Sequence, residues 1–545
     1  MDRAGARVNR LPRWFVAALT VGPATGLAVF FLWPFVTLLA EALSGEAISA
    51  TLGRDATWDV VWFTTWQAVV STVSTVLIAM APAYVVARFD FRTRRLLVGL
   101  LTAVFVLPTV VMGAAILALL PESLDRTVFA IVAAHVVFNL AVVVRLVGAM
   151  WEHLPTDMEA AAATLGASRW QVFTQISLPL IRPSVIAAAT VVFLFSFTSF
   201  GVIRVVGATG TRTVEVEIWR RATQLGDIGG AAVLTVLQLL VLGAGLAWST
   251  TAQRRHSRAL GLTLRSPLRR PTGRGERRLV TGVVAATFAV AGAPLVALVV
   301  RSFSTPTGWS ATAWTDLGRT EIRPGIRVGV DPWNAIANSL VNAVWATLFA
   351  VVVGGLATLA IAAAGRAGRV LDAGLMLPLG TSAVTIGFGM LITFDAPPVD
   401  WRASWWLVPV GHALIAVPFV VRATLGVLRS VAPDLTTAAA TLGAPPVRAW
   451  RETVVPYLWR PLAAGAGLAA AISLGEFGAT SFLSRSGGET MPIAIERLLG
   501  RTGSLLQAQG FALATMLAVT TIVAVAVTDR LQAGGPSAGR DRGSS

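Results

Sequence analysis

Long blocks of apolar residues recur along the chain, separated by shorter stretches rich in Arg, Gly, Pro and Ser. A helix that crosses the roughly 30 Å hydrocarbon core of a bilayer needs about 20 mostly apolar residues. Twelve blocks approach that length: 14–39, 60–86, 96–120, 128–150, 184–206 and 230–249 in the first half, and 279–300, 340–364, 370–394, 405–428, 461–483 and 511–527 in the second. The pattern predicts an all-α integral membrane protein with about twelve transmembrane helices.

Composition supports a membrane protein, and the placement of the arginines accounts for the net positive charge. The 545 residues are 55% hydrophobic and only 13% charged, with a mean hydropathy of +0.71, which excludes an ordinary soluble protein. A net charge of +16 could indicate nucleic-acid binding. However, if the N-terminus lies inside and the chain crosses twelve times, most arginines fall on the inner side, as the positive-inside rule expects. We therefore expect a multi-pass protein of the cell (inner) membrane with both termini in the cytoplasm, and no nucleic-acid partner.

A basic segment divides the chain into two halves. Nine arginines lie between Arg254 and Arg278, among frequent Pro, Gly and Ser. This composition is typical of a cytoplasmic linker, and it also suits contact with anionic membrane lipid. We expect a first repeat at 1–250, a linker at 251–278, a second repeat at 279–530 and a disordered cytoplasmic tail at 531–545.

Two Ala-rich stretches, EAAAATLGAS and TTAAATLGAP, occupy matching places in the two halves. Gly166 in the first stretch corresponds to Gly443 in the second, and we call the spacing between these two glycines the repeat offset. The same offset relates His135 to His412, Arg145 to Arg422, Asp157 to Asp434, Pro179 to Pro456, Phe200 to Phe477, Gly201 to Gly478, Thr213 to Thr490, Ile218 to Ile495 and Arg220 to Arg497. Six crossings separate the members of each pair, which places both on the same side of the membrane. The sequence thus predicts two parallel six-helix repeats.

Both Ala-rich stretches are expected on the cytoplasmic side, between the fourth and fifth crossings of their halves. Alanine is the best helix former, and Gly166 allows a turn before a second, amphipathic piece. The expected structure is a helix, a turn and a helix beneath the membrane. Such a segment can pack on its own protein alone or dock in a groove of a partner. Its occurrence at two matching points favours docking.

The segments EAAAATLGASRWQVFTQISLPLIRP and TTAAATLGAPPVRAWRETVVPYLWRP resemble the EAA loop of ATP-binding-cassette (ABC) importer permeases. That loop has an acidic residue, two alanines, a Leu-Gly pair and a later Leu-Pro pair. The first EAA loop spans about 157–183 and the second about 434–461. By resemblance, the residues that dock the ATPase are Glu159, Ala160, Ala161, Gly166 and Pro179 in the first loop, and Asp434, Ala438, Ala439, Gly443 and Pro456 in the second.

The resemblance covers nearly the whole chain and implies a fold of the type I importer permease. Fused twelve-helix chains of this kind are similar to the thiamine and ferric-iron importers, and the segment SFTSFGVIRVVGATGTRTVEVEIWRRA resembles the thiamine type. The implied cargo is thiamine or a thiamine phosphate, with ferric iron as the alternative. The implied partners are two copies of an ABC ATPase subunit and an extracytoplasmic substrate-binding protein. A more distant alternative is an ion-coupled secondary transporter, although acidic residues are sparse in the apolar blocks.

The second EAA loop departs from the usual motif. Glu159 is one place early in the first loop, while Thr436 and Thr437 stand where an acid is expected in the second, with only Asp434 nearby. In the family, the acid is thought to fix the loop helix or to engage a basic residue of the ATPase. The second loop is therefore expected to rely more on shape than on charge.

Residues for catalysis are missing from the sequence. A Walker A site needs a lysine, and the chain has none. It also lacks cysteine, and its four histidines are scattered, so no metal site is expected. We expect a transport subunit that binds no cofactor and is not an enzyme, with ATP and Mg²⁺ used by a partner.

One acidic residue within an apolar block is a candidate for the translocation path. Glu476 lies in the sequence SLGEFGAT, where Gly475 and Gly478 would let backbone and cargo approach closely, and the repeat matches Glu476 with Ser199. A carboxylate paired with a neighbouring helix only for packing is the alternative. His135 and His412 are expected to be hydrogen-bonded structural residues rather than ligands. The segment GATGTRTVEVEIWRR is a possible outer gate or docking surface, or a solvated loop.

Overall fold

The computed structural model describes residues 11–208, 210–256, 268–305, 308–323, 326–327, 329–396, 399–430, 433–501 and 503–533. Helices dominate these residues, and the strands form only three short antiparallel hairpins. The all-α fold is confirmed. Part of the predicted linker, at 257–267, and most of the predicted tail lie outside the described residues.

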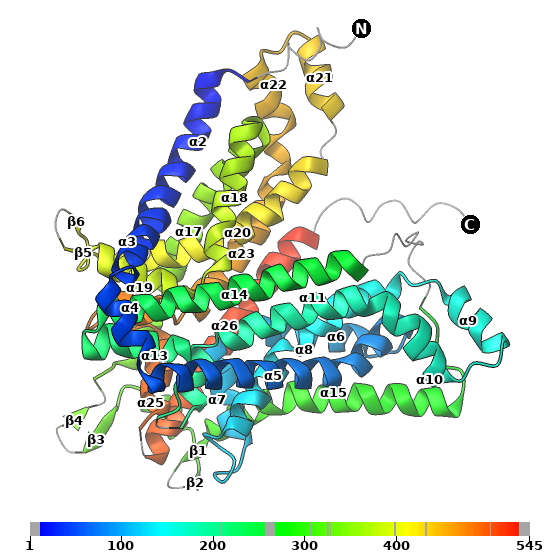
Figure 1. The fold of residues 1–545 in the computed structure, drawn as a ribbon, viewed down its shortest axis with the longest axis horizontal. Coiled ribbons are helices and arrows are strands. Elements are labelled where there is room, and N and C mark those ends of the chain that lie inside the picture. Colours follow the sequence, from blue (N-terminus) through cyan, green and yellow to red (C-terminus); the bar gives the residue numbers. More distant parts are fainter. Residues whose placement is uncertain are drawn as a thin grey trace. The chain divides into compact units, whose positions relative to one another are not determined.

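The helices of the first half follow one another along the chain with short connections (Figure 1). They are α2 Arg13–Leu27, α3 Trp33–Ala42, α4 Gly45–Leu52, α5 Asp55–Arg88, α6 Arg94–Val106, α7 Thr109–Leu119, α8 Val128–Glu152, α9 Thr156–Thr164, α10 Arg169–Val172, α11 Leu178–Phe197, α12 Gly201–Val206, α13 Val214–Arg220 and α14 Ile228–His256. Three π-helical turns, Ala28–Leu32, Phe173–Ser177 and Arg221–Leu225, continue neighbouring helices.

The second half repeats this order. Its helices are α15 Arg274–Arg301, α16 Thr312–Thr315, α17 Pro332–Ala363, α18 Arg366–Gly380, α19 Ala383–Thr393, α20 Leu407–Ser430, α21 Pro433–Thr441, α22 Pro446–Thr453, α23 Trp459–Gly475, α24 Thr480–Leu483, α25 Met491–Leu499 and α26 Ser504–Ala533, with a 3₁₀ turn at Val455–Tyr457. The hairpins are β1 Ser304–Thr305 with β2 Gly308–Trp309, β3 Glu321–Arg323 with β4 Ile326–Arg327, and β5 Asp395–Ala396 with β6 Val399–Asp400.

Two of the predicted spans are sharply bent rather than straight. α6 and α7 meet at 111°, and α18 and α19 meet at 101°. In the first pair, Pro108 has no N–H to continue the helix, and it holds Leu107 in an extended conformation with ψ 142°. In the second pair, Ser382 caps the new helix, since its side chain accepts a hydrogen bond from the Thr385 N–H. Local residues therefore explain both bends.

Within the described ranges, nine helices are long and apolar enough to cross a membrane, and each bent pair adds one more span if counted as one. The remaining predicted block, 461–483, forms α23, which ends at Gly475 and is followed by the short α24. The matching block of the first half, 184–206, is likewise divided into α11 and α12. A multi-pass membrane protein is thus confirmed, with more breaks in its helices than the apolar blocks indicated.

The chain forms two compact units that do not follow the division at the linker. Unit 1 contains 1–41, 318–497 and 516–545, and unit 2 contains 42–317 and 498–515. The first helix of each half therefore belongs to the unit built mainly from the other half. In unit 1, α2 packs on α17; in unit 2, α15 packs on α6 and α7. The division into repeats at 1–250 and 279–530 remains a prediction from sequence.

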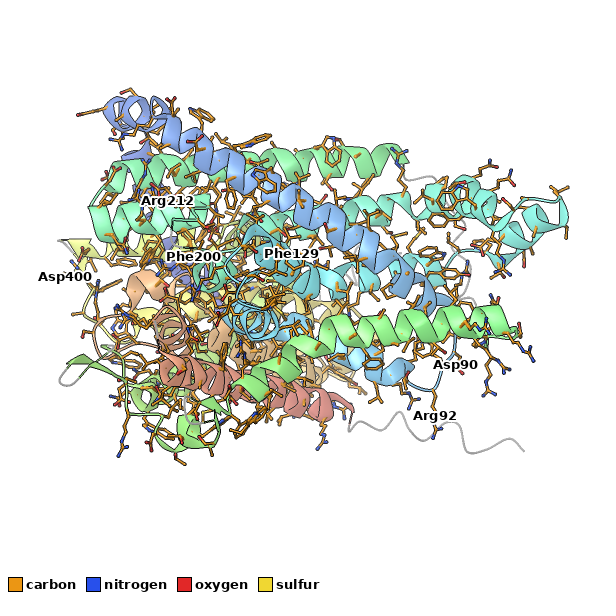
Figure 2. The ribbon with its side chains drawn as sticks, turned by 90° about the horizontal axis from the view of Figure 1, so that it is seen from below. Asp90, Arg92, Phe129, Phe200, Arg212 and Asp400 are labelled. Atoms are coloured by element: carbon orange, nitrogen blue, oxygen red, sulfur yellow. The ribbon has the colours of Figure 1, made fainter. Side chains whose placement is uncertain are left out.

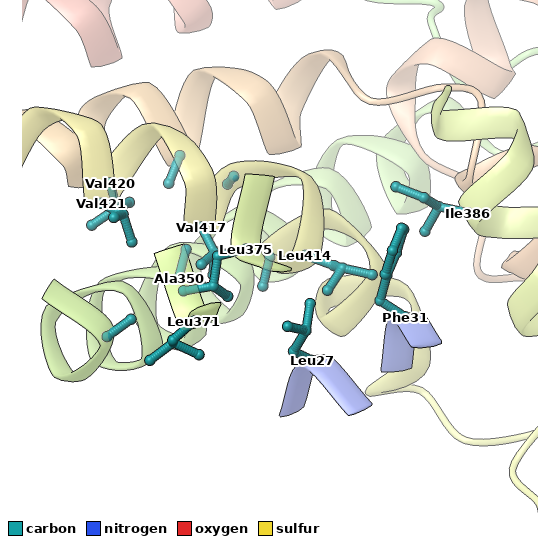
Figure 3. Close-up of a cluster of buried hydrophobic side chains, with 14 of the residues drawn as sticks. Leu27, Phe31, Ala350, Leu371, Leu375, Ile386, Leu414, Val417, Val420 and Val421 are labelled. Atoms are coloured by element: carbon teal, nitrogen blue, oxygen red, sulfur yellow. The ribbon is translucent and has the colours of Figure 1, made fainter. Parts of the chain in front are cut away.

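The core of unit 1 shows this exchange in its side chains. Leu27 and Phe31, from the start of the chain, pack with Leu375 of α18, Ile386 of α19 and Leu414 of α20 (Figure 3). All five side chains are less than a tenth exposed. The start of the chain thus completes the core of the second half.

The repeat is visible in a pair of matching hydrogen bonds. In unit 2, the Thr64 hydroxyl on α5 accepts a bond from the Val214 N–H at 2.9 Å. In unit 1, the Ser339 hydroxyl on α17 accepts a bond from the Met491 N–H at 2.8 Å. The repeat offset relates Val214 to Met491, whereas Ser339 comes slightly before the position that this offset gives for Thr64. The two halves therefore share this contact, although the stretch of chain between its two residues is slightly longer in the second half.

Small residues let α17 approach α20 closely. Without water to expel between helices in lipid, such packing depends on close van der Waals contact. Gly354 on α17 has no room for a side chain, because a Cβ there would lie 2.8 Å from Cγ1 of Val420. Gly426 on α20 faces open space instead.

We expect Gly354→Ala to destabilise the protein by about 1–3 kcal/mol, because overpacking would push α17 away from α20. Gly426→Ala is the matched control and should leave the protein as stable or slightly more stable, since alanine favours a helix. The measurement is the melting temperature of each purified variant. Equal melting temperatures for the two variants would contradict the close packing.

Candidate functional site

The first EAA loop has the helix, turn and helix that its sequence predicts. α9 has no buried residue and ends at Thr164, and the chain then turns at Gly166, whose φ is +87°. The Ala167 N–H bonds to the Ala162 carbonyl at 3.1 Å, a pairing typical of a helix that ends in a left-handed residue. The Ser168 hydroxyl then accepts from the Gln171 N–H and begins α10. Pro179 lies at the start of α11.

The second EAA loop has the same backbone geometry. α21 ends at Thr441, the chain turns at Gly443, whose φ is +86°, and the Ala444 N–H bonds to the Ala439 carbonyl at 3.0 Å. Pro445 precedes α22, and Pro456 lies in the 3₁₀ turn before α23. Ala438 lies within α21, as Ala160 and Ala161 lie within α9. The side chain of Asp434 is outside the described residues.

Large apolar side chains project into solvent at equivalent places on both loops. Leu165 is 89% exposed and Leu442, its match in the repeat, is 88% exposed. Met158 and Leu435 also match, and they are 46% and 40% exposed. Paired exposed apolar residues beside a fixed turn form a surface that a partner can cover. Neither leucine packs into the core of its own unit.

The acid of the first loop is turned toward its own protein. Arg88, the last residue of α5, donates to Glu159 at 3.1 Å, and the Ser177 hydroxyl donates to the same oxygen at 2.8 Å. Arg88 is only 6% exposed. Of the two roles that the family suggests for this acid, these contacts favour fixing the loop helix over engaging a partner.

Arg88 did not emerge from the sequence as a functional candidate. Its only sequence signal is a single arginine at the end of a long apolar block, which also describes an ordinary residue at the membrane boundary. Asp90 and Arg92 follow it toward one end of unit 2, whereas Phe200 and Arg212 lie toward the other end (Figure 2). The first EAA loop and the predicted outer segment are thus at opposite ends of this unit.

The predicted path residue Glu476 follows the last turn of α23 and is buried. Its carboxylate accepts hydrogen bonds from the Ala479 N–H and the Thr480 N–H, each at 2.9 Å, and from the Thr480 hydroxyl at 2.6 Å. His412 Nε2 lies 3.3 Å from the same carboxylate. These contacts cap the backbone where α23 breaks, and they favour the packing alternative.

The other candidate path residues lie beside breaks in helices. Gly475 ends α23, and a Cβ on Gly478 would lie 3.0 Å from the Cβ of Ala383. Ser199 is buried between α11 and α12 in unit 2. Ser199 and Glu476 belong to different units, so their convergence on one path remains a prediction.

The matched histidines have different surroundings. His412 bonds to the hydroxyls of Ser473 and Thr480, each at 2.8 Å. His135 bonds to the Ser71 hydroxyl at 3.0 Å, and its Nε2 has no hydrogen-bond partner among the described residues. Both histidines have buried hydrogen bonds to neighbouring helices, as a structural role requires. In the part of the chain that the structure describes, no group of three or more His, Asp or Glu could hold a metal ion.

The predicted outer segment contains the helix α13. α13 buries Glu215 and Glu217, and Glu215 accepts from Gln238 at 2.7 Å. Glu217 accepts from Arg220 and Arg221 at 2.8–3.0 Å. Burial alone raises the pKa of the Glu217 carboxyl, but the hydrogen bonds from the two arginines outweigh it, so the pKa lies below its ordinary value. The acids therefore hold the helical part of this segment in place, whereas Ala208, Gly210 and Arg212 before it are exposed and lie outside any helix.

We expect Glu476→Gln to reduce the amount of folded protein, because glutamine has one acceptor oxygen and would turn its amide toward a backbone N–H. Leaving a buried donor without a partner costs about 1–3 kcal/mol. Glu452→Gln is the control, since Glu452 is exposed and pairs with Arg448 on its own helix. Folded protein is measured by size-exclusion chromatography.

Transport by the same variants separates the two roles of Glu476. If it is a packing acid, cargo uptake per folded permease should be unchanged in Glu476→Gln. A normal yield of folded protein with slower uptake would instead support the path.

Comparison with known proteins identifies the fold family. The model of the family described as "binding-protein-dependent transport system inner membrane component" matches twice, at 76–258 and at 350–534. Each match includes one EAA loop. The repeat seen in the sequence is therefore a repeat of this family's domain.

Relatives that match over nearly the whole chain share one description. The thiamine transport system permease protein ThiP of Salmonella typhimurium is 25% identical over 91% of this chain and 93% of its own. ThiP of Brucella abortus is 29% identical over 94% and 95%. A putative 2-aminoethylphosphonate transport system permease protein, PhnV of Salmonella typhimurium, is 29% identical over 36% of this chain and 74% of its own.

Proposed function

We propose that this chain, which belongs to the family of binding-protein-dependent transport system inner membrane components, passes thiamine or a thiamine phosphate across the membrane. An ABC importer permease is the coarser conclusion and follows from the family. The cargo is inferred from relatives that match more than nine-tenths of the chain and are described as thiamine permeases. Ferric iron, the alternative from sequence, has no comparable support among these relatives.

The matched exposed leucines support docking of two ATPase copies. Leu165 and Leu442 stand beside the same left-handed turn in two copies of one structural unit. Two equivalent surfaces suit two identical partners, and an exposed leucine next to alanines suits a groove. Because the chain has no lysine for a phosphate-binding loop, the energy of ATP has to enter through such partners.

Transport then occurs by alternation of the permease between two states. An extracytoplasmic binding protein delivers the cargo, and closure of the ATPase pair pulls on the two EAA loops. The helices that carry the loops, α8 and α11 in one half and α20 and α23 in the other, move between inward-open and outward-open arrangements. The chain itself contributes shape and helix movement, while hydrolysis belongs to the partner.

Uptake by proteoliposomes tests the cargo. We expect vesicles that contain this chain, its ATPase and its binding protein to accumulate labelled thiamine only with ATP, and the purified chain alone to hydrolyse none. Unlabelled thiamine phosphate should compete, whereas ferric iron and 2-aminoethylphosphonate should not. ATP-dependent uptake of iron without uptake of thiamine would overturn the proposed cargo and leave the permease assignment intact.

We expect Leu165→Asp or Leu442→Asp to weaken ATPase binding at least about tenfold, because each would place a charge in a desolvated contact worth about 2 kcal/mol. Leu124→Asp is the matched control, since Leu124 is 40% exposed and lies outside both loops. Binding is measured by titration of the solubilised chain with the ATPase. Unchanged affinity in both loop variants would reject the docking surface.

A further inference from the structure

One buried arginine fastens the first EAA loop to the transmembrane helices. Arg88 Nη2 donates to Glu159 at 3.1 Å, and Nη1 donates to the Leu154 carbonyl at 3.3 Å. Ser177, at the start of the helix that follows the loop, donates to the same Glu159 oxygen. We call these four residues the Arg88 clamp. The clamp joins the end of α5, the end of α8, the loop helix α9 and the start of α11.

The second half has different residues at the positions that match Arg88, Glu159 and Ser177. The spacing that relates Thr64 to Ser339 also matches Arg88 with Ala363, and these are the last residues of α5 and α17. The repeat offset matches Glu159 with Thr436 and Ser177 with Val454. Alanine, threonine and valine cannot form an ion pair. Of the two matched sets of residues, only that of the first half can form this ion pair.

A cavity lies at the corresponding place in the second half. It has a volume of about 690 Å³, and its lining includes Ala363, Thr436, Arg13 and Trp450. Trp450 packs edge-on against Phe15 with ring centroids 5.9 Å apart. Among the described residues, the second half therefore has aromatic packing beside a cavity at the place where the first half has an ion pair.

The two kinds of support resist movement differently. Separating Arg88 from Glu159 would leave a buried guanidinium without its anion, which is strongly unfavourable. Apolar surfaces can slide with little loss as long as they stay in contact, because their attraction has no preferred direction. The first loop should therefore move only together with α5, whereas the second can shift against α17.

We propose that Arg88 is a positioning residue that holds the first EAA loop rigidly to its helices, and that the second EAA loop is compliant because it lacks this clamp. The consequence for transport rests on the proposed function. When the ATPase pair closes, its movement is transmitted fully to the helices of the first half and only in part to those of the second half. The mechanical inequality of the loops does not rest on it.

The absence of cysteine from the chain allows a direct test. A single spin label is placed at Leu165→Cys or at Leu442→Cys in the full-length permease without any partner. These positions match in the repeat and are equally exposed. We expect the label at 442 to be more mobile than the label at 165. Arg88→Met should raise mobility at 165 at least about twofold and leave 442 unchanged, as local unfastening predicts.

Two further variants keep this test decisive. Arg92→Met is the matched control, because Arg92 follows the same helix but is exposed, and it should change neither label. Glu159→Gln breaks the ion pair from the other side, so it serves if Arg88→Met does not fold, and it should also loosen position 165. Equal mobility at 165 and 442 in the parent chain, or no response at 165 to either clamp variant, would overturn the proposal.

The ratio of cargo transported to ATP hydrolysed in the assembled importer is a second measurement. This ratio does not depend on the amount of folded protein. Cargo transported per ATP hydrolysed should fall at least about threefold in Arg88→Met, less in Arg88→Lys, and not in Arg92→Met. If the parent chain binds no ATPase, the proposed function fails while the label experiment still stands. If the ATPase binds and Arg88→Met transports as efficiently as Arg92→Met, Arg88 does not position the loop for coupling.

Discussion

Backbone hydrogen bonding in an apolar layer is the constraint on which this architecture depends. A helix satisfies its own N–H and C=O groups, so a long apolar helix needs no help, but each break exposes groups that must find other partners. Two of the breaks occur where such partners are present. Ser382 caps α19, and Glu476 accepts from two N–H groups after α23. At these two positions, a polar residue in an apolar block accompanies a break between helices.

The same reasoning explains why ion pairs concentrate at the ends of helices. Glu217 with Arg220 and Arg221 holds the segment before α14, and Arg88 with Glu159 holds the segment after α8. Both pairs are largely shielded from water, so they fix geometry more strongly than exposed pairs would. At the ends of the spans, these short connecting segments are therefore supported by charge, while the spans themselves pack through small and apolar side chains.

Much of the architecture could be predicted from sequence because it depends on periodicity and repetition. Apolar length marked the spans, and the fixed offset between Gly166 and Gly443 marked two equivalent turns, both of which have a positive φ. The bend at Pro108 and the break at Glu476 were missed, since an apolar block reports hydropathy and carries little information on direction. Arg88 was missed for another reason. Its partner Glu159 is 71 residues away, and one sequence holds no signal that joins them. Whether Glu476 touches cargo is a question of which surfaces face the path, and that depends on the arrangement of both units.

The exchange of first helices has a consequence for the synthesis of the protein. The core partners of Leu27 and Phe31 lie on α18, α19 and α20, which leave the ribosome long after α2. Throughout that interval the N-terminal helix has to remain in lipid without its permanent neighbours, and its long apolar surface is suited to that environment. The oldest segment of the chain therefore meets its core partners only after much of the second half has been made, and a chain interrupted at the linker would leave each half without one wall of its core.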